Sequence, residues 1–192
     1  MKDDILDGYV RVSEVLSQEQ DFSHIDEAVL TNKANIGTRL HKAIETFFED
    51  KMPIPDPQVT PYFNSFLKWH GLMKPKVIMQ ESRYYDHDKK FTGRIDAVIK
   101  LPYEKIPVLV DWKTSALVNP LIWPKQGHAY HHLLIKNGVT YLADRVLFIK
   151  LDPRGNLPKV FTVDIDPQGT QEFLELVDNY WEKRNNLDMK CQ

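Results

Sequence analysis

The amino-acid sequence predicts a mixed α/β fold, and three features of its apolar pattern indicate it. Apolar residues recur at helical spacing in the first third, strand-like runs follow between residues 77 and 113, and helical and strand patterns alternate after that. The chain has 192 residues, the size of one ordinary domain. We therefore expect a single domain over 1–192, with a mostly helical part at 1–74 and a sheet core with flanking helices at 75–192.

Three helices are expected in the helical part. Ser13 is a suitable N-cap for a short helix through Leu16, a longer helix runs from residue 24 or 26 to 50, and another from 57 to 70. The apolar stripe of the long helix consists of Ile36, Leu40, Ala43, Ile44, Phe47 and Phe48. The third helix carries aromatic residues that we expect in the core, with stacking on nucleic-acid bases as the alternative. These are Tyr62, Phe63, Phe66 and Trp69.

The sheet part begins with a hairpin. Residues 77–85 are expected as its first strand, 86–90 as its turn and 91–101 as its second strand. Residues 107–113 are dense in valine and leucine, which is typical of a central strand. The remaining expected elements are a helix at 121–137, strands at 145–151 and 159–164, and a last helix at 167–187 that begins with proline.

Composition excludes several classes of protein. Hydrophobic residues make up 42% and charged residues 27% of the chain, which excludes a disordered protein. No apolar run approaches the ~20 residues of a membrane span, and the acidic start at residues 1–4 predicts neither a signal nor a transit peptide. The single cysteine, Cys191, excludes a disulfide framework and a cysteine-ligated cluster, so we expect a cytoplasmic protein. The net charge of −2 gives no support to a dedicated DNA-binding protein but leaves open an enzyme that uses metal cations.

Asp111 and Lys113 are the first candidates for catalysis. They share one face of the apolar strand, because alternate residues of a strand point the same way. A carboxylate and an ammonium group on a buried strand are costly unless they are paired or used. The same spacing also occurs in polar segments, where solvent explains it, at Glu49/Lys51, Asp88/Lys90 and Asp188/Lys190.

Asp96 is the second candidate carboxylate and lies on the preceding strand. If the two strands are neighbours, Asp96 and Asp111 converge on one cation, and two carboxylates suit Mg²⁺ or Mn²⁺. A structural ion pair between Asp96 and Arg94 is the alternative. Alternation predicts one face with Arg94, Asp96 and Val98 and an apolar face with Ile95, Ala97 and Ile99.

Two helices carry further polar residues at one-turn spacing. Gly37, His41 and Glu45 line one edge of the apolar stripe, and Gln126 and Tyr130 share a face of the later helix. A glycine within a helix costs about 1 kcal/mol relative to alanine, so Gly37 calls for a reason such as close approach of another backbone. Taken singly, each of these spacings is common.

Together, these segments resemble the signature of PD-(D/E)XK nucleases of the RecB-like branch: Gly37-x-x-x-His41, Gly93-x-x-Asp96, Asp111-Trp112-Lys113-Thr114 and Gln126-x-x-x-Tyr130. Order, spacing and expected element agree over residues 37–130. The resemblance implies a restriction-endonuclease-like fold, a mixed β-sheet core flanked by helices with a helical N-terminal third. Ile95 stands where proline precedes the aspartate in other branches. Cysteines for an iron–sulfur cluster and a phosphate-binding loop are absent, so we expect neither a cluster nor a nucleotide.

The resemblance also implies roles for individual residues. The residues that match metal ligands are His41, Asp96, Asp111 and, through its backbone carbonyl, Trp112. Lys113 matches the catalytic lysine, which acts with Asp96 and Asp111. The residues expected to hold DNA and order the site are Gln126, Tyr130, Arg94 and Thr114. Glu45 and Glu81 are candidates for residues that contact and orient the metal ligands. Glu81 is alternatively a candidate for an additional ligand.

The implied activity is metal-dependent hydrolysis of DNA. The small free-standing chain favours an exonuclease on single strands or DNA ends, in recombination, repair or replication, similar to nucleases of phage recombination and mitochondrial genome maintenance. Alternatives are an endonuclease of the same superfamily and a non-catalytic DNA-binding module with a nuclease fold. A further alternative is a different metallohydrolase built on His128, His131 and His132. Lys33, Arg39, Lys42 and Lys125 can steer DNA only if they cluster.

Overall fold

A computed structural model describes residues 5–21, 23–115 and 117–190 of the chain. Residues 1–4 and Cys191, on which the expectations about the N-terminal segment and the cysteine rest, lie outside this range. The elements are β1 (Val10–Arg11), α1 (Val12–Ser17), α2 (Glu27–Phe48), α3 (Thr60–Met73), β2 (Lys76–Asp86), β3 (Phe91–Lys100), β4 (Val108–Lys113), α4 (Ile122–Lys136), β5 (Arg145–Lys150), β6 (Lys159–Asp164) and α5 (Pro167–Lys190). The predicted mixed α/β fold class is confirmed.

The strands form one mixed sheet in the order β1-β3-β4-β5-β6, with β2 paired to β3. β2 runs antiparallel along β3 as the predicted hairpin, and β4 is antiparallel to β3 on its other edge. β5 lies parallel to β4, and β6 antiparallel to β5. The assumption that the strands of Asp96 and Asp111 are neighbours is therefore correct.

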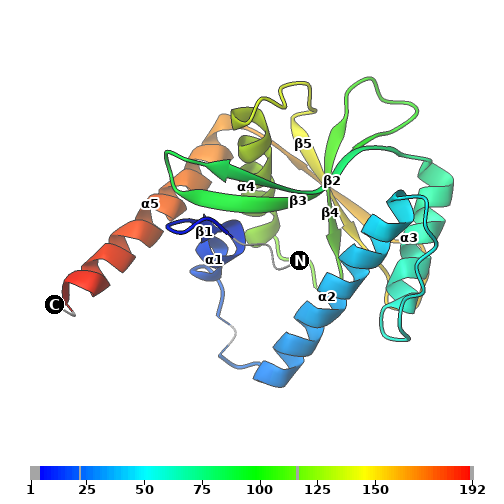
Figure 1. Ribbon diagram of the computed structural model, residues 1–192, viewed down its shortest axis with the longest axis horizontal. Coiled ribbons are helices and arrows are strands. Elements are labelled where there is room, and N and C mark those ends of the chain that lie inside the picture. The colour runs from blue at the N-terminus through cyan, green and yellow to red at the C-terminus, as the bar shows by residue number, and fades with distance from the viewer. Residues whose placement is uncertain (1–4, 22, 116, 191–192) are drawn as a thin grey trace.

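Helices cover both faces of the sheet (Figure 1). On one face, α1, α4 and α5 enclose a core cluster that includes Leu109 and Phe148. On the other face, α2 and α3 enclose a second cluster that includes Val110 and Ile149. β4 and β5 give alternate residues to the two clusters, as strands buried on both faces must.

The aromatic residues of α3 lie in the second cluster. Tyr62, Phe63, Phe66 and Trp69 are all buried. Phe66 and Trp69 contact the indole of Trp112 edge-on, with ring centroids 5.3 and 5.4 Å apart. Core packing is thus confirmed for these rings, and stacking on nucleic-acid bases is excluded for this helix.

Two helix starts and one short strand differ from the expectation. α1 begins at Val12 with Arg11 as its N-cap, and Glu14 accepts the Arg11 backbone N–H, so Ser13 lies inside the helix. α3 begins at Thr60, because Asp56 closes a turn by accepting the backbone N–H groups of residues 58, 59 and 60. β1 was not expected, since a strand of two residues has no apolar pattern of its own.

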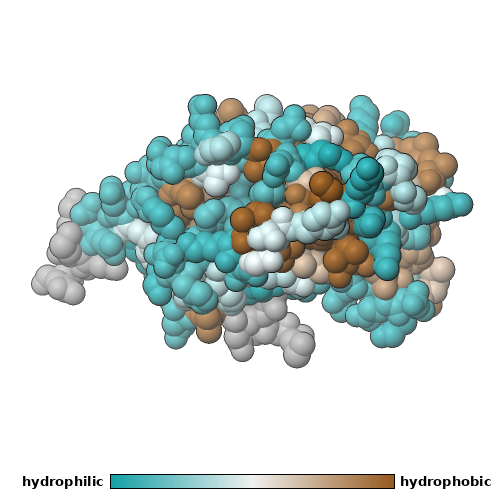
Figure 2. Space-filling model, turned by 90° about the horizontal axis from the view of Figure 1, so that it is seen from above, coloured by the Kyte–Doolittle hydropathy of each residue, from teal (hydrophilic) through white to brown (hydrophobic). Residues whose placement is uncertain are grey.

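The surface seen from above is mainly hydrophilic, with small groups of apolar side chains in its central and right-hand parts (Figure 2). Exposed large apolar side chains in the described part of the chain include Met52, Ile54, Leu72 and Ile78. Single exposed apolar residues are normal on the surface of a folded domain. None of the described helices combines the length and the apolar character that crossing a bilayer requires.

Candidate metal centre

The candidate site lies on one edge of β3, between the segment that pairs with β1 and the segment that pairs with β4. β2 occupies the other edge of β3 over its whole length. On the site's edge, β4 pairs with residues 97–99 and β1 pairs with residues 91–92, so residues 93–96 lie between the two pairings. The Asp96 side chain enters this gap, where its Oδ2 accepts the backbone N–H of Trp112 at 2.8 Å. The sheet therefore has a polar gap between β1 and β4, and Asp96 lines it.

Three side chains from different elements meet in this gap. His41 from α2, Glu81 from β2 and Asp96 from β3 each place one ligand atom within 4.8 Å of the others. The Nδ1 of His41 lies 3.3 Å from Asp96 Oδ1 and 3.6 Å from Glu81 Oε1. Its Nε2 donates to the Trp112 carbonyl oxygen at 3.1 Å. One imidazole nitrogen and two carboxylates therefore converge, while the Trp112 carbonyl lies at the other nitrogen of the same ring.

Glu81 reaches this group through an unusual backbone conformation. Its φ is +47°, in the left-handed region, although it lies within a strand. Such a conformation costs on the order of 1–3 kcal/mol for a non-glycine residue and is retained where surrounding contacts impose it. Arg94 provides one such contact, since its Nε lies 2.7 Å from Glu81 Oε2.

Strand alternation is interrupted opposite Glu81. Ile95 belongs to the core cluster under α4, together with Val98, whereas Ala97 and Ile99 belong to the cluster under α2 and α3. The expected apolar face of Ile95, Ala97 and Ile99 is therefore wrong. The Asp96 carboxylate reaches β4, where it accepts the backbone N–H of Trp112.

Asp111 and Lys113 form a second polar group beside the first. Both side chains point to the face covered by α4, where Lys113 Nζ lies 2.7 Å from Asp111 Oδ2. Gln126 bridges the pair: its Oε1 accepts from Lys113 Nζ at 2.7 Å and its Nε2 donates to Asp111 Oδ1 at 3.1 Å. The same Nε2 donates to the Tyr130 hydroxyl at 3.0 Å. Gln126 thus contacts the strand motif directly, and Tyr130 contacts it through Gln126.

The electrostatics of the two carboxylates differ. Burial raises the pKa of Asp96, but His41, Lys113 and the Trp112 N–H outweigh burial and lower it below its usual value. Burial raises the pKa of Asp111, and the nearby Asp96 adds to this effect, while Lys113 opposes it. Each of the two buried carboxylates has a basic side chain beside it, His41 for Asp96 and Lys113 for Asp111.

The pKa of His41 reports the same excess of negative charge. Burial lowers it, but the adjacent Asp96 and Glu81 carboxylates raise it well above the usual value for histidine. The two ring nitrogens of His41 face different oxygen atoms, Nδ1 the Asp96 carboxylate and Nε2 the Trp112 carbonyl. A cation bound here would take the place of the proton on the ring.

A pocket of about 520 Å³ gives access to the site, and its lining residues are Thr38, His41, Lys42, Glu45, Glu81, Arg94, Asp96 and Tyr130. Glu45 faces this pocket but is paired with Lys42 at 2.6 Å. Thr114 lies next to Gly37, where an added Cβ would meet Thr114 Oγ1 at 3.6 Å, an ordinary contact. The expected close backbone approach at Gly37 is therefore not found.

Gly93, by contrast, is required by packing. A Cβ at Gly93 would lie 2.8 Å from the Tyr130 ring and 2.9 Å from a Leu133 methyl group. Both of these side chains are buried and have little room to move. The glycine of one motif thus makes room for the tyrosine of another.

We expect Gly93→Ala to displace the Tyr130 ring and to loosen its contact with Gln126. Overpacking of this kind destabilises by about 1–3 kcal/mol. The measurement is urea unfolding of the variant next to Gly71→Ala, since a Cβ at Gly71 meets no atom within 4 Å. Equal stability of the two variants would contradict the packing argument.

The alternative site of three histidines is not supported. His128 Nδ1 contacts Thr170 Oγ1, His131 Nε2 lies 3.7 Å from Asp144, and His132 Nε2 donates to Asp86. Because each ring contacts a different partner, these histidines form no metal-capable group within the described ranges.

The cations proposed to steer DNA are mostly neutralised. Arg39 is paired with Asp56 at 2.7 Å and Lys125 with Glu19 at 2.5 Å. Lys42 is paired with Glu45. These residues therefore do not form the positive cluster that steering requires.

The architecture is that of nuclease-like folds, a six-stranded mixed sheet flanked by helices. A candidate exonuclease from Eubacterium rectale is 10% identical, and the alignment covers 92% of this chain and 79% of that one with a TM-score of 0.52. The protein SSO0001 is 13% identical, with 93% and 77% covered and a TM-score of 0.51. An alkaline exonuclease from Laribacter hongkongensis is 11% identical, with 96% and 95% covered and a TM-score of 0.46. No protein-family model and no curated protein sequence matches the chain.

Proposed function

We propose that this protein is a Mg²⁺- or Mn²⁺-dependent deoxyribonuclease of the PD-(D/E)XK superfamily, RecB-like branch. The observation that carries the proposal is the convergence of His41, Glu81 and Asp96 beside the Asp111–Lys113 pair. The fold shared with a candidate exonuclease supports it. The finer proposal is an exonuclease that acts on single strands or DNA ends, in recombination, repair or replication.

The donor set fits a hard divalent cation. Carboxylate and carbonyl oxygens with one imidazole suit Mg²⁺ or Mn²⁺ better than softer ions. We propose His41, Glu81 and Asp96 as ligands. Asp111 and the Trp112 carbonyl are proposed as further ligands once Asp111 has released Lys113 and the carbonyl has released His41 Nε2. A bound cation supplies a more acidic water and positive charge for a phosphate.

The remaining residues have separate roles in this proposal. Lys113 is held by Asp111 and Gln126, so its ammonium group is positioned to neutralise charge that develops on the phosphate or to orient the attacking water. Gln126 and Tyr130 hold Lys113 and Asp111 in place. Arg94 and Thr114 are proposed to contact the DNA backbone.

Digestion of end-labelled DNA tests this proposal. We expect hydrolysis of linear single-stranded DNA with Mg²⁺ or Mn²⁺, none with chelator, and a loss of about 100-fold or more in Lys113→Ala, as for removal of one charge-stabilising group. Lys105→Ala, in an exposed loop, serves as the matched lysine control.

Three results would change the proposal. Circular single-stranded DNA cut as fast as linear DNA would replace the exonuclease by an endonuclease. Mn²⁺ binding without hydrolysis of any DNA form would leave a non-catalytic DNA-binding module. Equal activity of wild type and Lys113→Ala would remove Lys113 from the reaction.

A further inference from the structure

The β2–β3 hairpin and β1 share an open sheet face that leads away from the candidate metal centre. In the register of the sheet, Arg83 lies opposite Arg94, and both Tyr85 and Arg11 are partners of Thr92. Paired residues of neighbouring strands project from the same face. This face is the one opposite α4, because Tyr84 pairs with Gly93 on the α4 side.

Three rings gather at the far end of this face. The rings of Tyr85 and His87 are nearly parallel, with an interplanar angle of 4° and centroids 6.0 Å apart. Tyr9 meets Tyr85 edge-on at 5.1 Å, and its hydroxyl is hydrogen-bonded to His87 Nδ1. Tyr9 and Tyr85 are half-buried and His87 is exposed. Aromatic rings held in this way, with part of their surface in solvent, resemble the stacking surfaces that bind unpaired bases.

Cations accompany the rings. Lys90 Nζ lies 5.1 Å above the Tyr9 ring and is exposed. Arg11 is exposed, and its Nη1 lies 4.0 Å from Glu14 Oε1 in a long ion pair. Arg83 lies between the rings and the metal centre. We call this set the hairpin platform: Tyr9, Arg11, Arg83, Tyr85, His87 and Lys90.

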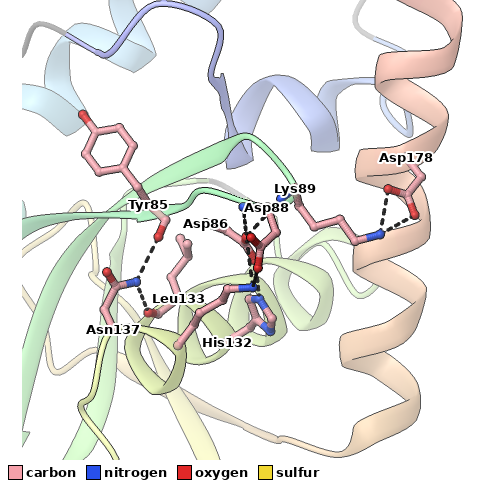
Figure 3. Close-up of polar contacts among 9 residues, drawn as sticks. Tyr85, Asp86, Asp88, Lys89, His132, Leu133, Asn137 and Asp178 are labelled. Atoms are coloured by element: carbon pink, nitrogen blue, oxygen red, sulfur yellow. Dashed lines mark hydrogen bonds and ion pairs between the residues drawn. The ribbon is translucent and has the colours of Figure 1, made fainter.

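The platform is held in place from its opposite side, as Figure 3 shows. There the Tyr85 ring points away from α4 while the Asp86 side chain points toward it. Asp86 is buried and accepts from His132 at 2.8 Å, and Lys89 pairs with Asp178 of α5 at 2.6 Å. The Tyr85 carbonyl accepts from Asn137 at 3.0 Å. A platform fixed to two helices loses little conformational freedom when a ligand binds.

We propose that the hairpin platform binds single-stranded DNA and leads it to the metal centre, an inference that rests on the proposed nuclease function. Residues 81, 83 and 85 of β2, and residue 87 in the turn after it, lead from the candidate ligand Glu81 to the rings. Six residues of strand span roughly 20 Å, room for a few nucleotides of an extended strand. Tyr9, Tyr85 and His87 stack with bases, and Lys90, Arg83 and Arg11 contact phosphates. Paired bases of a duplex are stacked on each other and do not offer their faces to these rings.

Binding of fluorescein-labelled oligothymidylates, measured by anisotropy in Ca²⁺ with oligonucleotide integrity checked on gels, tests the platform. We expect Tyr85→Ala to weaken binding of a 12-mer by about 5- to 100-fold, the usual effect of losing one stacked base. Lys90→Ala should lower the slope of log affinity against log salt by about 0.7, the loss of one single-strand phosphate contact. Duplex DNA of the same length should show little change with Tyr85→Ala.

Matched controls come from two loops that contact each other. Tyr141 and Lys105 are both exposed, and the Tyr141 hydroxyl donates to the Lys105 carbonyl oxygen at 3.2 Å. Tyr141→Ala and Lys105→Ala should bind as wild type does. Tyr85→Leu keeps apolar bulk without the ring, and it should weaken binding even if Tyr85→Ala unfolds.

Two results would contradict the proposal that the hairpin platform binds single-stranded DNA. One is single-strand affinity within twofold of wild type in Tyr85→Leu and Lys90→Ala. The other is an equal loss in the controls. Binding in Ca²⁺ is measured without turnover, so a wild type that binds single strands through the platform but hydrolyses no DNA with Mn²⁺ would refute the nuclease proposal alone.

Discussion

Asp96→Asn is expected to reduce DNA hydrolysis by about 1,000-fold or more while the fold is retained. Asp96 contacts both sides of the site: one carboxylate oxygen faces His41, and the other accepts the backbone N–H of Trp112. Asparagine keeps an acceptor for the Trp112 N–H but removes the negative charge that a divalent cation needs. The loss of several kcal/mol of metal-derived stabilisation corresponds to about three orders of magnitude in rate.

The measurement combines three readouts on the same protein. Initial rates on linear single-stranded DNA give the loss of activity, calorimetric titration with Mn²⁺ gives the loss of metal affinity, and urea unfolding shows whether the fold is kept. Asp144→Asn is the matched control, because the Asp144 side chain is 85% exposed and lies on another part of the surface. Activity within tenfold of wild type would exclude Asp96 as a metal ligand.

Local sequence signals predict much of this fold, because the positions that are buried in the structure are the ones that carry apolar residues in the sequence. Asp26 was a candidate start of the long helix, and it caps α2 by accepting the N–H groups of Ala28 and Val29. The apolar run at 107–113 is buried on both faces, as its composition indicates. β1 has no such signal, since its two residues become a strand only by pairing with β3 some 80 residues later.

The site could be predicted less completely, because parts of it are created by tertiary contacts. The structure brings His41 together with Asp96 and Asp111 together with Lys113, but Asp111 lies outside the group formed by His41, Glu81 and Asp96. The position of Glu81 beside His41 depends on a left-handed backbone that no residue pattern reveals. The need for glycine at position 93 depends on the Tyr130 ring, which a helix 37 residues later supplies.

The sequence likewise treats residues 86–90 as an ordinary solvated turn, yet Asp86 is completely buried. One sequence signal could have predicted this buried carboxylate. An acidic residue at the end of a strand can accept hydrogen bonds from the backbone N–H groups of the turn that follows it. The Asp86 Oδ1 accepts from the backbone of Asp88 and Lys89, both at 3.0 Å. The helix that covers it supplies His132 and Lys136, and neither could be connected to Asp86 from spacing alone.

Asp86→Ala is expected to lower the free energy of unfolding by about 2–3 kcal/mol. Removing one partner of a fully buried ion pair costs about 3–5 kcal/mol. The cost is smaller here, because the Lys136 side chain is 35% exposed and can be rehydrated. For a chain of this size the change corresponds to a decrease in Tm of roughly 4–12 °C. Because Asp86 holds the hairpin platform against α4, the substitution should also weaken single-strand binding.

The pH dependence follows from the direction of the Asp86 shift. Burial raises its pKa, but the Lys89 N–H, His132 and Lys136 outweigh burial and hold it below its usual value. The stability that the carboxylate contributes is therefore fully present above the unfolded-state pKa of about 3.9, and it is lost as pH falls through the lower folded-state pKa. Urea unfolding should show the full difference between wild type and Asp86→Ala at pH 7 and a decreasing one as the pH falls below the unfolded-state pKa.

Asp88→Ala provides the control for this prediction. Asp88 lies two residues away and pairs with the same lysine at 2.6 Å, but its side chain is 81% exposed. An exposed ion pair contributes about 0–1 kcal/mol, so this variant should unfold close to wild type at both pH values. Equal destabilisation of Asp86→Ala and Asp88→Ala would mean that Lys136, and not the buried carboxylate with its backbone donors, holds the hairpin to α4.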